Sequence, residues 1–134
     1  MLRPRVTCQA NPHSRLLIIR CIGNLDGPAV AERIQAHLTA IPDAWDYDHI
    51  IDFSRFDGVF LGNDTEDMTA WWRALASDRD AGCLTAVVSN DPLMQVRQSI
   101  CQELLPLREV AVFGRFSEGS DWIVMRRQAR LAAA

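Results

Sequence analysis

Short apolar segments alternate with longer amphipathic segments along almost the whole chain, and this alternation constrains the fold more than any other feature of the sequence. The segments with strand character are residues 6–10, 16–22, 50–53, 84–88 and 109–113. Turn residues separate the first two segments, which predicts a hairpin. The later strands alternate with helices, which implies right-handed crossovers between parallel strands. We therefore predict an α/β fold with a mixed, mostly parallel five-stranded sheet, an antiparallel edge hairpin strand and about four helices.

Four segments have apolar residues at helical spacing, and residues that start or stop helices bound them. The predicted starts are Asp26, the acidic stretch 63–67, Asp91 and Ser117, and the predicted ends of the first three helices are Pro42, Gly82 and Pro106. Proline closely follows both Asp26 and Asp91, as is typical of a helix N-cap. In the third helix, the residues expected to share one side are Leu93, Val96, Ile100, Cys101 and Leu104.

The size and charge of the chain limit its classes of function. Its 134 residues and 15.1 kDa predict a single domain over residues 1–134, with a core at about residues 6–125. The net charge of -3 gives no broad basic surface for nucleic acid. The amino terminus lacks the apolar run of a signal peptide, and no run of roughly eighteen apolar residues occurs. We expect a cytoplasmic protein that does not insert into membranes.

The residue types exclude several kinds of catalysis. All 14 basic Lys and Arg positions are arginine, and the sequence contains no lysine. Mechanisms that require a lysine amine are therefore excluded. The four cysteines are far apart and lack a histidine at finger spacing, so they indicate neither a zinc site nor a redox dithiol. The histidines have no acidic or nucleophilic partner at a recognised spacing. We therefore predict no catalytic residue, no metal, no cofactor and no enzymatic activity.

One enzymatic alternative stays open at this point. Asp26, Asp52 and Asp91 follow predicted strands, and ligands of open α/β sheets collect outside the carboxyl ends of the strands. Three converging carboxylates would bind Mg²⁺, as in a phosphohydrolase. The competing interpretation is that Asp26 and Asp91 cap helices, because aspartate is a preferred N-cap residue.

The loop after Asp52 keeps apolar residues where loops usually turn polar. These residues either fold back onto the core or form a surface for a partner or ligand, and the sequence leaves both open. The adjacent Trp71 and Trp72 likewise belong to the core or anchor a partner. The predicted ligand- or partner-binding residues are Phe53, Phe56, Val59, Phe60, Leu61, Trp71 and Trp72. We expect the partner to be a second copy of the chain in a homodimer, another protein, or a lipid-like small molecule.

Several core segments also carry a resemblance to a known fold. They are residues 16–19 followed by Gly23, residues 50–52 with Phe56 and Gly58, residues 85–88, residues 112–113 and residues 122–123. On these residues the chain resembles the STAS-like fold of anti-sigma-factor antagonists and sulfate-transporter tails, and most of all its SpoIIAA-like branch of small bacterial proteins. The resemblance implies an interaction module. Together with the missing lysine, the missing catalytic set and the apolar loop, it predicts a non-catalytic regulatory or binding module that uses an apolar surface for protein–protein contact or a small apolar ligand.

The same resemblance draws attention to the helix start after the central strand. Anti-sigma antagonists are switched by phosphorylation of a serine in an Asp-Ser-x-Gly turn there, whereas residues 62–65 of this chain lack that serine. Thr65 is the nearest hydroxyl and the candidate for phosphorylation. Its acidic neighbours oppose an added phosphate, although the helix amino terminus favours one.

Overall fold

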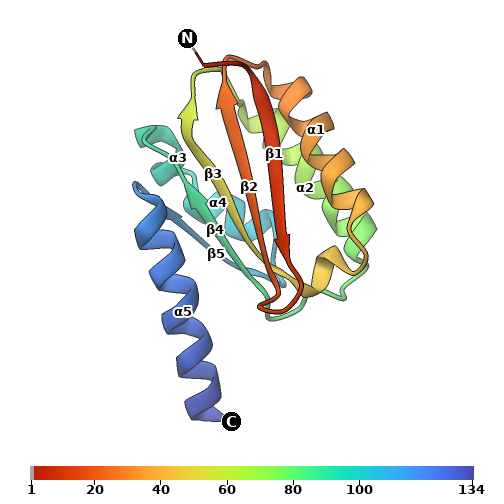
Figure 1. The fold of residues 1–134 in the computed structure, drawn as a ribbon, viewed down its shortest axis with the longest axis vertical. Coiled ribbons are helices and arrows are strands. Elements are labelled where there is room, and N and C mark those ends of the chain that lie inside the picture. The colour runs from red at the N-terminus through yellow and green to blue at the C-terminus, as the bar shows by residue number, and fades with distance from the viewer. Residues whose placement is uncertain (1) are drawn as a thin grey trace.

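A five-stranded sheet in the order β1-β2-β3-β4-β5 forms the centre of the computed structural model, which describes residues 2–134 (Figure 1). The strands are β1 (Arg5–Asn11), β2 (Leu16–Gly23), β3 (Asp48–Phe56), β4 (Leu84–Val88) and β5 (Glu109–Phe113). The helices are α1 (Gly27–Ala40), α2 (Gly62–Ala76), α3 (Pro92–Val96), α4 (Gln98–Leu104) and α5 (Phe116–Ala133), and a 3₁₀ helix spans Ala44–Asp46. The order of strands and helices agrees with the alternation of apolar segments in the sequence.

The sheet is mixed, as predicted. β1 pairs antiparallel with β2, and the other three pairs are parallel. The hairpin between β1 and β2 turns on Asn11, whose side chain accepts hydrogen bonds from the backbone N–H groups of His13 and Ser14 at 3.1 and 3.2 Å. Side-chain amides of this kind hold tight turns. β1 is therefore an antiparallel edge strand on an otherwise parallel sheet.

The two faces of the sheet are covered unequally (Figure 1). Leu17 and Ile19 of β2 point to the same face of the sheet, because alternate side chains of a strand do so. Both are fully buried in the core cluster that this face shares with α1 and α2. α5 packs on the opposite face against β3, β4 and β5, where Ile123 is buried. α5 leaves the part of this second face that β1 and β2 form largely uncovered.

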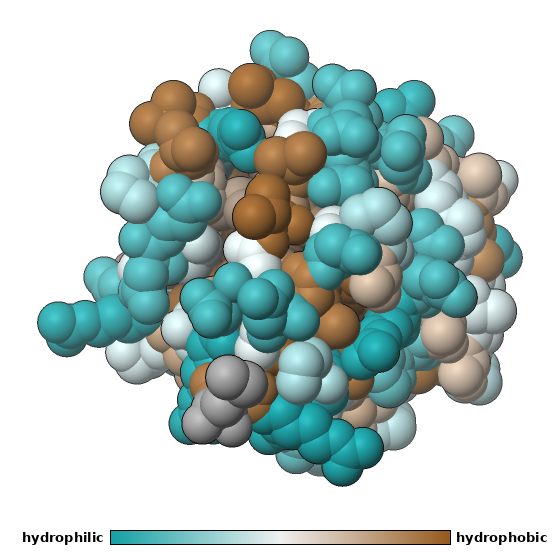
Figure 2. All heavy atoms as spheres, turned by 90° about the horizontal axis from the view of Figure 1, so that it is seen from above, coloured by the Kyte–Doolittle hydropathy of each residue, from teal (hydrophilic) through white to brown (hydrophobic). Residues whose placement is uncertain are grey.

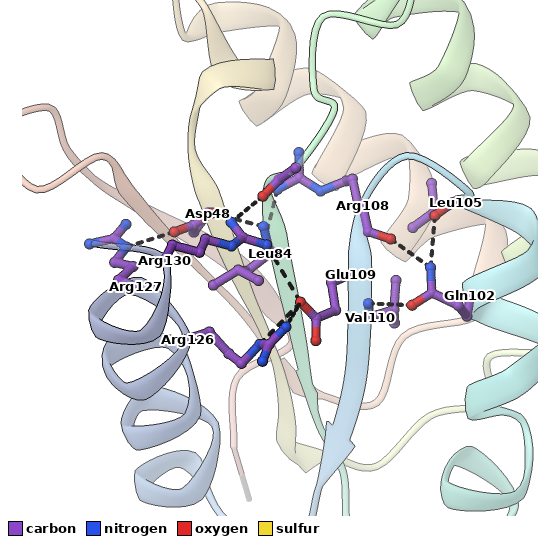
Figure 3. Close-up of polar contacts among 11 residues, drawn as sticks. Asp48, Leu84, Gln102, Leu105, Arg108, Glu109, Val110, Arg126, Arg127 and Arg130 are labelled. Carbon is purple, nitrogen blue, oxygen red and sulfur yellow. Dashed lines mark hydrogen bonds and ion pairs between the residues drawn. The ribbon is translucent and has the colours of Figure 1, made fainter. Parts of the chain in front are cut away.

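Two glutamines of α4 cover the edge strand β5. The side-chain oxygens of Gln98 and Gln102 accept the backbone N–H groups of Val112 and Val110 at 2.9 and 2.8 Å. The Nε2 group of Gln102 also donates to the backbone oxygen of Arg108 at 2.6 Å (Figure 3). These bonds satisfy polar groups that an edge strand otherwise leaves open to another chain.

Several predicted helix boundaries are confirmed and others are wrong. Asp26 and Asp91 are N-caps, accepting the N–H groups of Ala29 at 2.8 Å and Leu93 at 3.0 Å. α2 ends at Ala76, before Gly82, because Ser77 and Asp78 take left-handed conformations with φ of 49° and 64°.

Two further corrections concern the later helices. The predicted third helix is two helices that break at Arg97, and this break places the glutamines of α4 against β5. Ser117 lies inside α5, whose N-cap is Arg115, because the chain enters the helix directly after Gly114. The chain therefore has five α-helices within the described residues, one more than predicted.

Candidate functional site

The loop between β3 and α2, residues 57–61, lies against the loop that precedes α1. The Asp57 N–H donates to the Gly23 backbone oxygen at 2.9 Å, and Val59 forms an isolated bridge with Asp26. Gly58 permits this approach, since a Cβ there would lie 1.9 Å from the Leu25 backbone oxygen. The loop is thus held at the carboxyl ends of the parallel strands, where open α/β sheets bind ligands.

The three phenylalanines of this region form one cluster. The Phe53 ring lies 5.5 Å from the Phe56 ring and 5.7 Å from the Phe60 ring, measured between centroids. Phe53 is buried and the other two are half-buried. The aromatic rings of this region therefore pack against the core, whereas Val59 and Leu61 are 61% and 52% exposed.

These residues surround a hollow of about 230 Å³, which we call the mouth cavity. Its lining comprises Phe53, Ser54, Phe56, Gly58, Val59, Phe60 and Leu61 on one side, and Ser89, Asn90, Asp91, Leu93, Met94 and Arg97 on the other. Leu93 is 57% exposed. Figure 2 looks onto this end of the molecule and shows hydrophobic residues at the surface among hydrophilic neighbours. Five of the seven predicted binding residues meet here.

Trp71 and Trp72 lie apart from the mouth cavity. Trp72 is buried in the core, and its Nε1 donates to Asp80 Oδ2 at 2.8 Å. Its ring meets His49 edge-on, with 5.0 Å between centroids. Trp71 is half-buried and, with Trp72, lines a separate small hollow of about 40 Å³. Trp72 thus takes the core role that the sequence allowed.

A second small hollow, of about 50 Å³, lies between this one and the mouth cavity. The two small hollows share five lining residues, namely Ile51, Met68, Thr69, Thr85 and Leu105, and we call the two together the seam. These residues come from β3, α2, β4 and the end of α4. The seam therefore runs between the two helices and the sheet, and its exposed lining is almost wholly apolar.

Arg108 closes the inner end of the seam and is buried among three segments of the chain. Its Nε donates to Thr85 Oγ1 at 2.8 Å, and its Nη2 donates to the backbone oxygens of Tyr47 and Leu84 at 2.7 and 2.9 Å. Figure 3 shows the side chain extending from the start of β5 toward β4. Burial is the main cause that lowers the pKa of Arg108 from its usual value.

His49 lies beside this arginine. Its Nε2 is 3.0 Å from the backbone oxygen of Ala44. Burial, followed by the positive charge of Arg108, lowers the pKa of His49 well below its usual 6.5. His49 is therefore neutral at pH 7, and with Nε2 facing a carbonyl oxygen the neutral ring donates there.

The three carboxylates of the enzymatic alternative do not converge. Asp26 and Asp91 cap different helices. Asp52 pairs with Arg20 at 3.8 Å, and its Oδ1 accepts the Ser54 N–H at 2.9 Å. Among residues 2–134, no three His, Cys, Asp or Glu side chains are grouped to hold a metal ion. The prediction of a Mg²⁺ site at Asp26, Asp52 and Asp91 therefore has no support in the structure.

The cysteines are free thiols whose pKa values are raised. Burial is the main cause in all four cases, and it raises the pKa of Cys21 to about 12. Thiols in such surroundings stay protonated at neutral pH and are poor nucleophiles.

Thr65 lies in the first turn of α2 and is half-buried. Its hydroxyl donates to the Leu61 backbone oxygen at 3.4 Å. The neighbouring Asp64 turns back to accept the Leu61 N–H at 2.8 Å, which occupies this helix start with a carboxylate. An added phosphate would meet that negative charge.

The arginines near the end of α5 have partners that the sequence did not reveal. Arg127 pairs with Asp48 at 2.7 Å, and Arg126 and Arg130 pair with Glu109 at 2.9 and 3.5 Å (Figure 3). These pairs join α5 to the starts of β3 and β5. The arginine cluster is therefore engaged with the domain itself.

Sequence reasoning missed the second wall of the mouth cavity and the inner end of the seam. Leu93 was expected on one side of a single amphipathic helix, and no role was predicted for Arg108. The stripe Leu93, Val96 and Ile100 normally signals burial, whereas these residues are exposed in the structure. No local pattern indicates that an arginine will be buried.

Three further observations bear on the class of protein. No helix within residues 2–134 is long and apolar enough to cross a membrane. No family model matches the sequence. No curated protein matches it.

A solved structure does match the fold. It is an uncharacterized protein of the DUF3478 family from Shewanella loihica PV-4, described as having a SpoIIAA-like fold. The two chains are 15% identical and superpose with a TM-score of 0.54, over 89% of this chain and 92% of the other. At this identity the likeness concerns the fold, and the predicted SpoIIAA-like fold is confirmed.

Proposed function

We propose that this chain, a domain with the SpoIIAA-like fold, is a non-catalytic binding module that takes the apolar group of a small molecule into the mouth cavity. The observation that carries the proposal is the exposure of Val59, Leu61 and Leu93, each more than half exposed around one hollow. Single exposed apolar residues are ordinary, whereas several around a cavity mark a binding surface. Burying them stabilises a complex by about 25 cal/mol per Å² of apolar surface.

The composition of the mouth cavity supports a small apolar ligand. Its lining includes the aromatic rings of Phe53, Phe56 and Phe60 together with the polar side chains of Ser89, Asp91 and Arg97. Small-molecule sites typically combine apolar and aromatic walls with a few polar groups that orient the ligand. The thiols are protonated and His49 is buried and neutral, so these groups are poor candidates for nucleophilic or acid–base catalysis. The arrangement therefore favours binding.

The test uses N-phenyl-1-naphthylamine, a neutral apolar fluorophore. Wild-type protein is expected to bind it saturably with one site per chain. The double substitution Leu61→Ser and Leu93→Ser should weaken binding by about tenfold, equivalent to about 1.4 kcal/mol. The matched control is Val124→Ser with Met125→Ser, because these α5 residues are similarly exposed and lie away from the cavity. Equal loss in both double variants, or no saturable binding by wild type, would overturn the proposal.

Self-association is a second candidate, and a specific observation favours it. Val96 and Ile100 extend the apolar surface beyond the mouth cavity and are 75% and 51% exposed. A twofold contact would bury this patch on both copies. Sedimentation equilibrium should then show a dimer that Val96→Ser with Ile100→Ser converts to a monomer. Wild-type protein that stays monomeric at all concentrations rejects this candidate.

A further inference from the structure

We propose that the seam is the inner part of the ligand site and that it takes a linear apolar chain carrying an uncharged oxygen acceptor at its inner end. The inference rests on the proposed function, since the chain would enter through the mouth cavity. It adds the shape of the ligand, the depth it reaches and the chemistry of its buried end.

The hollows follow one path through the molecule. The mouth cavity and the outer hollow of the seam share Phe53, Phe60 and Met94 in their linings. The outer and inner hollows share residues of β3, β4 and α2, among them Ile51 and Met68. Only a narrow ligand fits such a path between two helices and a sheet, which favours an unbranched chain.

The lining of the outer hollow is adaptable, and its threonine hydroxyls take part in hydrogen bonds within the protein. Hollows of about 50 and 40 Å³ are too small for a chain until side chains move. Met68 and Met94 line the outer hollow, and methionine changes shape more easily than other apolar side chains. The Thr69 hydroxyl is engaged with the Thr65 backbone oxygen at 2.8 Å. An apolar chain can therefore enter without stranding a polar group of the wall.

Arg108 lines the inner end of the path and has one donor group without a hydrogen bond. Arg108 is 2% exposed, and its Nη1 is, among residues 2–134, the buried side-chain nitrogen or oxygen that has no hydrogen bond. Nη1 lies 3.5 Å from Asp80 Oδ2 and forms an ion pair with it, but no hydrogen bond. Asp80 Oδ2 instead accepts a hydrogen bond from Trp72 Nε1. Leaving such a buried donor unpaired is costly, so an oxygen atom delivered by a ligand would be stabilised there.

The charges around Arg108 favour an uncharged acceptor. Asp80 already balances the guanidinium charge within a buried pair. A carboxylate added beside Asp80 would bring a like charge into a desolvated site, which is strongly unfavourable. The oxygen of an alcohol, ester or amide satisfies the donor without adding charge. The structure thus favours a fatty alcohol over the fatty acid of the same length.

The experiment compares two homologous series by titration calorimetry on the whole chain, namely n-alkan-1-ols and n-alkanoates of six to about twelve carbons. We expect alkanol affinity to rise about fourfold per added methylene until the path is filled. We also expect each alkanol to bind at least about tenfold more tightly than its alkanoate. An affinity that does not rise with chain length, or an alkanoate that binds as tightly as its alkanol, overturns the inference.

A variant that blocks the seam supplies an independent test. Met68→Trp should remove the gain from added methylenes, whereas Met125→Trp on the exposed face of α5 should keep it. If Met68→Trp does not fold, the wild-type series alone decides. A folded Met68→Trp protein that binds long alkanols like wild type rejects the seam.

The two proposals fail in different ways. If N-phenyl-1-naphthylamine binding depends on Leu61 and Leu93 but long alkanols gain nothing, the seam is wrong and the mouth cavity stands. If neither probe binds saturably, both proposals are wrong.

Discussion

At the scale of single residues, Arg108 connects several separate segments of the chain, and no pattern in the sequence indicates these contacts. It donates to Tyr47, Leu84 and Thr85 and forms an ion pair with Asp80. Removing one partner of a buried ion pair is destabilising because the other charge is left uncompensated. The stability of the domain should therefore depend strongly on Asp80.

Asp80→Asn should lower the free energy of unfolding by about 3 kcal/mol, since it leaves the Arg108 charge buried without its partner. Urea unfolding followed by circular dichroism measures this loss. The matched control is Asp78→Asn, in the same turn, where the side chain is exposed and asparagine tolerates the left-handed backbone. Equal stability of the two variants would show that the buried pair contributes nothing.

His49 should make stability depend on pH. In the folded protein the pKa of His49 lies well below 6.5, mainly because of burial. Below about pH 6.5, His49 therefore becomes protonated in the unfolded chain while it stays neutral in the folded protein. The contribution of His49 is thus fully present above pH 6.5 and is lost as the pH falls, with a slope of up to about 1.4 kcal/mol per pH unit. His49→Gln should lose this slope between pH 6.5 and 5, and the exposed His13→Gln should keep it. A His49→Gln protein with the wild-type slope would contradict this account.

At the scale of elements, the position of the loop between β3 and α2 decides whether the mouth cavity exists. Gly58 lets this loop lie on the Leu25 backbone, and the bridge from Val59 to Asp26 continues the contact. The position of the exposed apolar side chains of the loop therefore depends on Gly58.

Gly58→Ala should displace the loop, because the added Cβ would lie 1.9 Å from the Leu25 backbone oxygen. We expect a loss of about 1–3 kcal/mol in unfolding free energy and weaker binding of N-phenyl-1-naphthylamine. Gly62→Ala is the control, since a Cβ there meets no described atom within 4 Å. If both alanine variants bind the fluorophore like wild type, the loop position is not what forms the site.

Most elements could be predicted from the sequence because local signals and packing agree there. The strand 109–113 and the caps Asp26 and Asp91 are examples. The break at Arg97 could not be predicted, because it depends on Gln98 reaching the edge of β5, a contact across fourteen residues. The end of α2 was missed because Ser77, which precedes Gly82, already takes the left-handed conformation.

At the scale of the whole molecule, the SpoIIAA-like fold could be predicted and only half of the candidate site could. The loop 57–61 was recognisable because apolar residues are unusual in a loop. The second wall of the mouth cavity came from α3, whose apolar stripe normally signals burial. The far end of the seam came from Arg108, whose burial depends on partners in three other segments. Such tertiary arrangements leave no mark in local spacing.

A broad hollow of about 520 Å³ on the uncovered part of the sheet gives a competing location for a ligand. Arg5, Arg20 and Arg55 line it together with Asp52. These charged walls differ from the aromatic floor of the mouth cavity, so a neutral apolar probe should distinguish the two locations.

The most direct test of the central claim, that the mouth cavity is the binding site, is a ¹H–¹⁵N chemical-shift titration of wild-type protein with N-phenyl-1-naphthylamine. The account predicts saturable shifts that are largest for the amides of residues 57–61 and of Leu93 and Met94, with residues 124–131 of α5 unchanged. Shifts that are largest on α5 or around Arg5, Arg20 and Arg55, or shifts that never saturate, would contradict it.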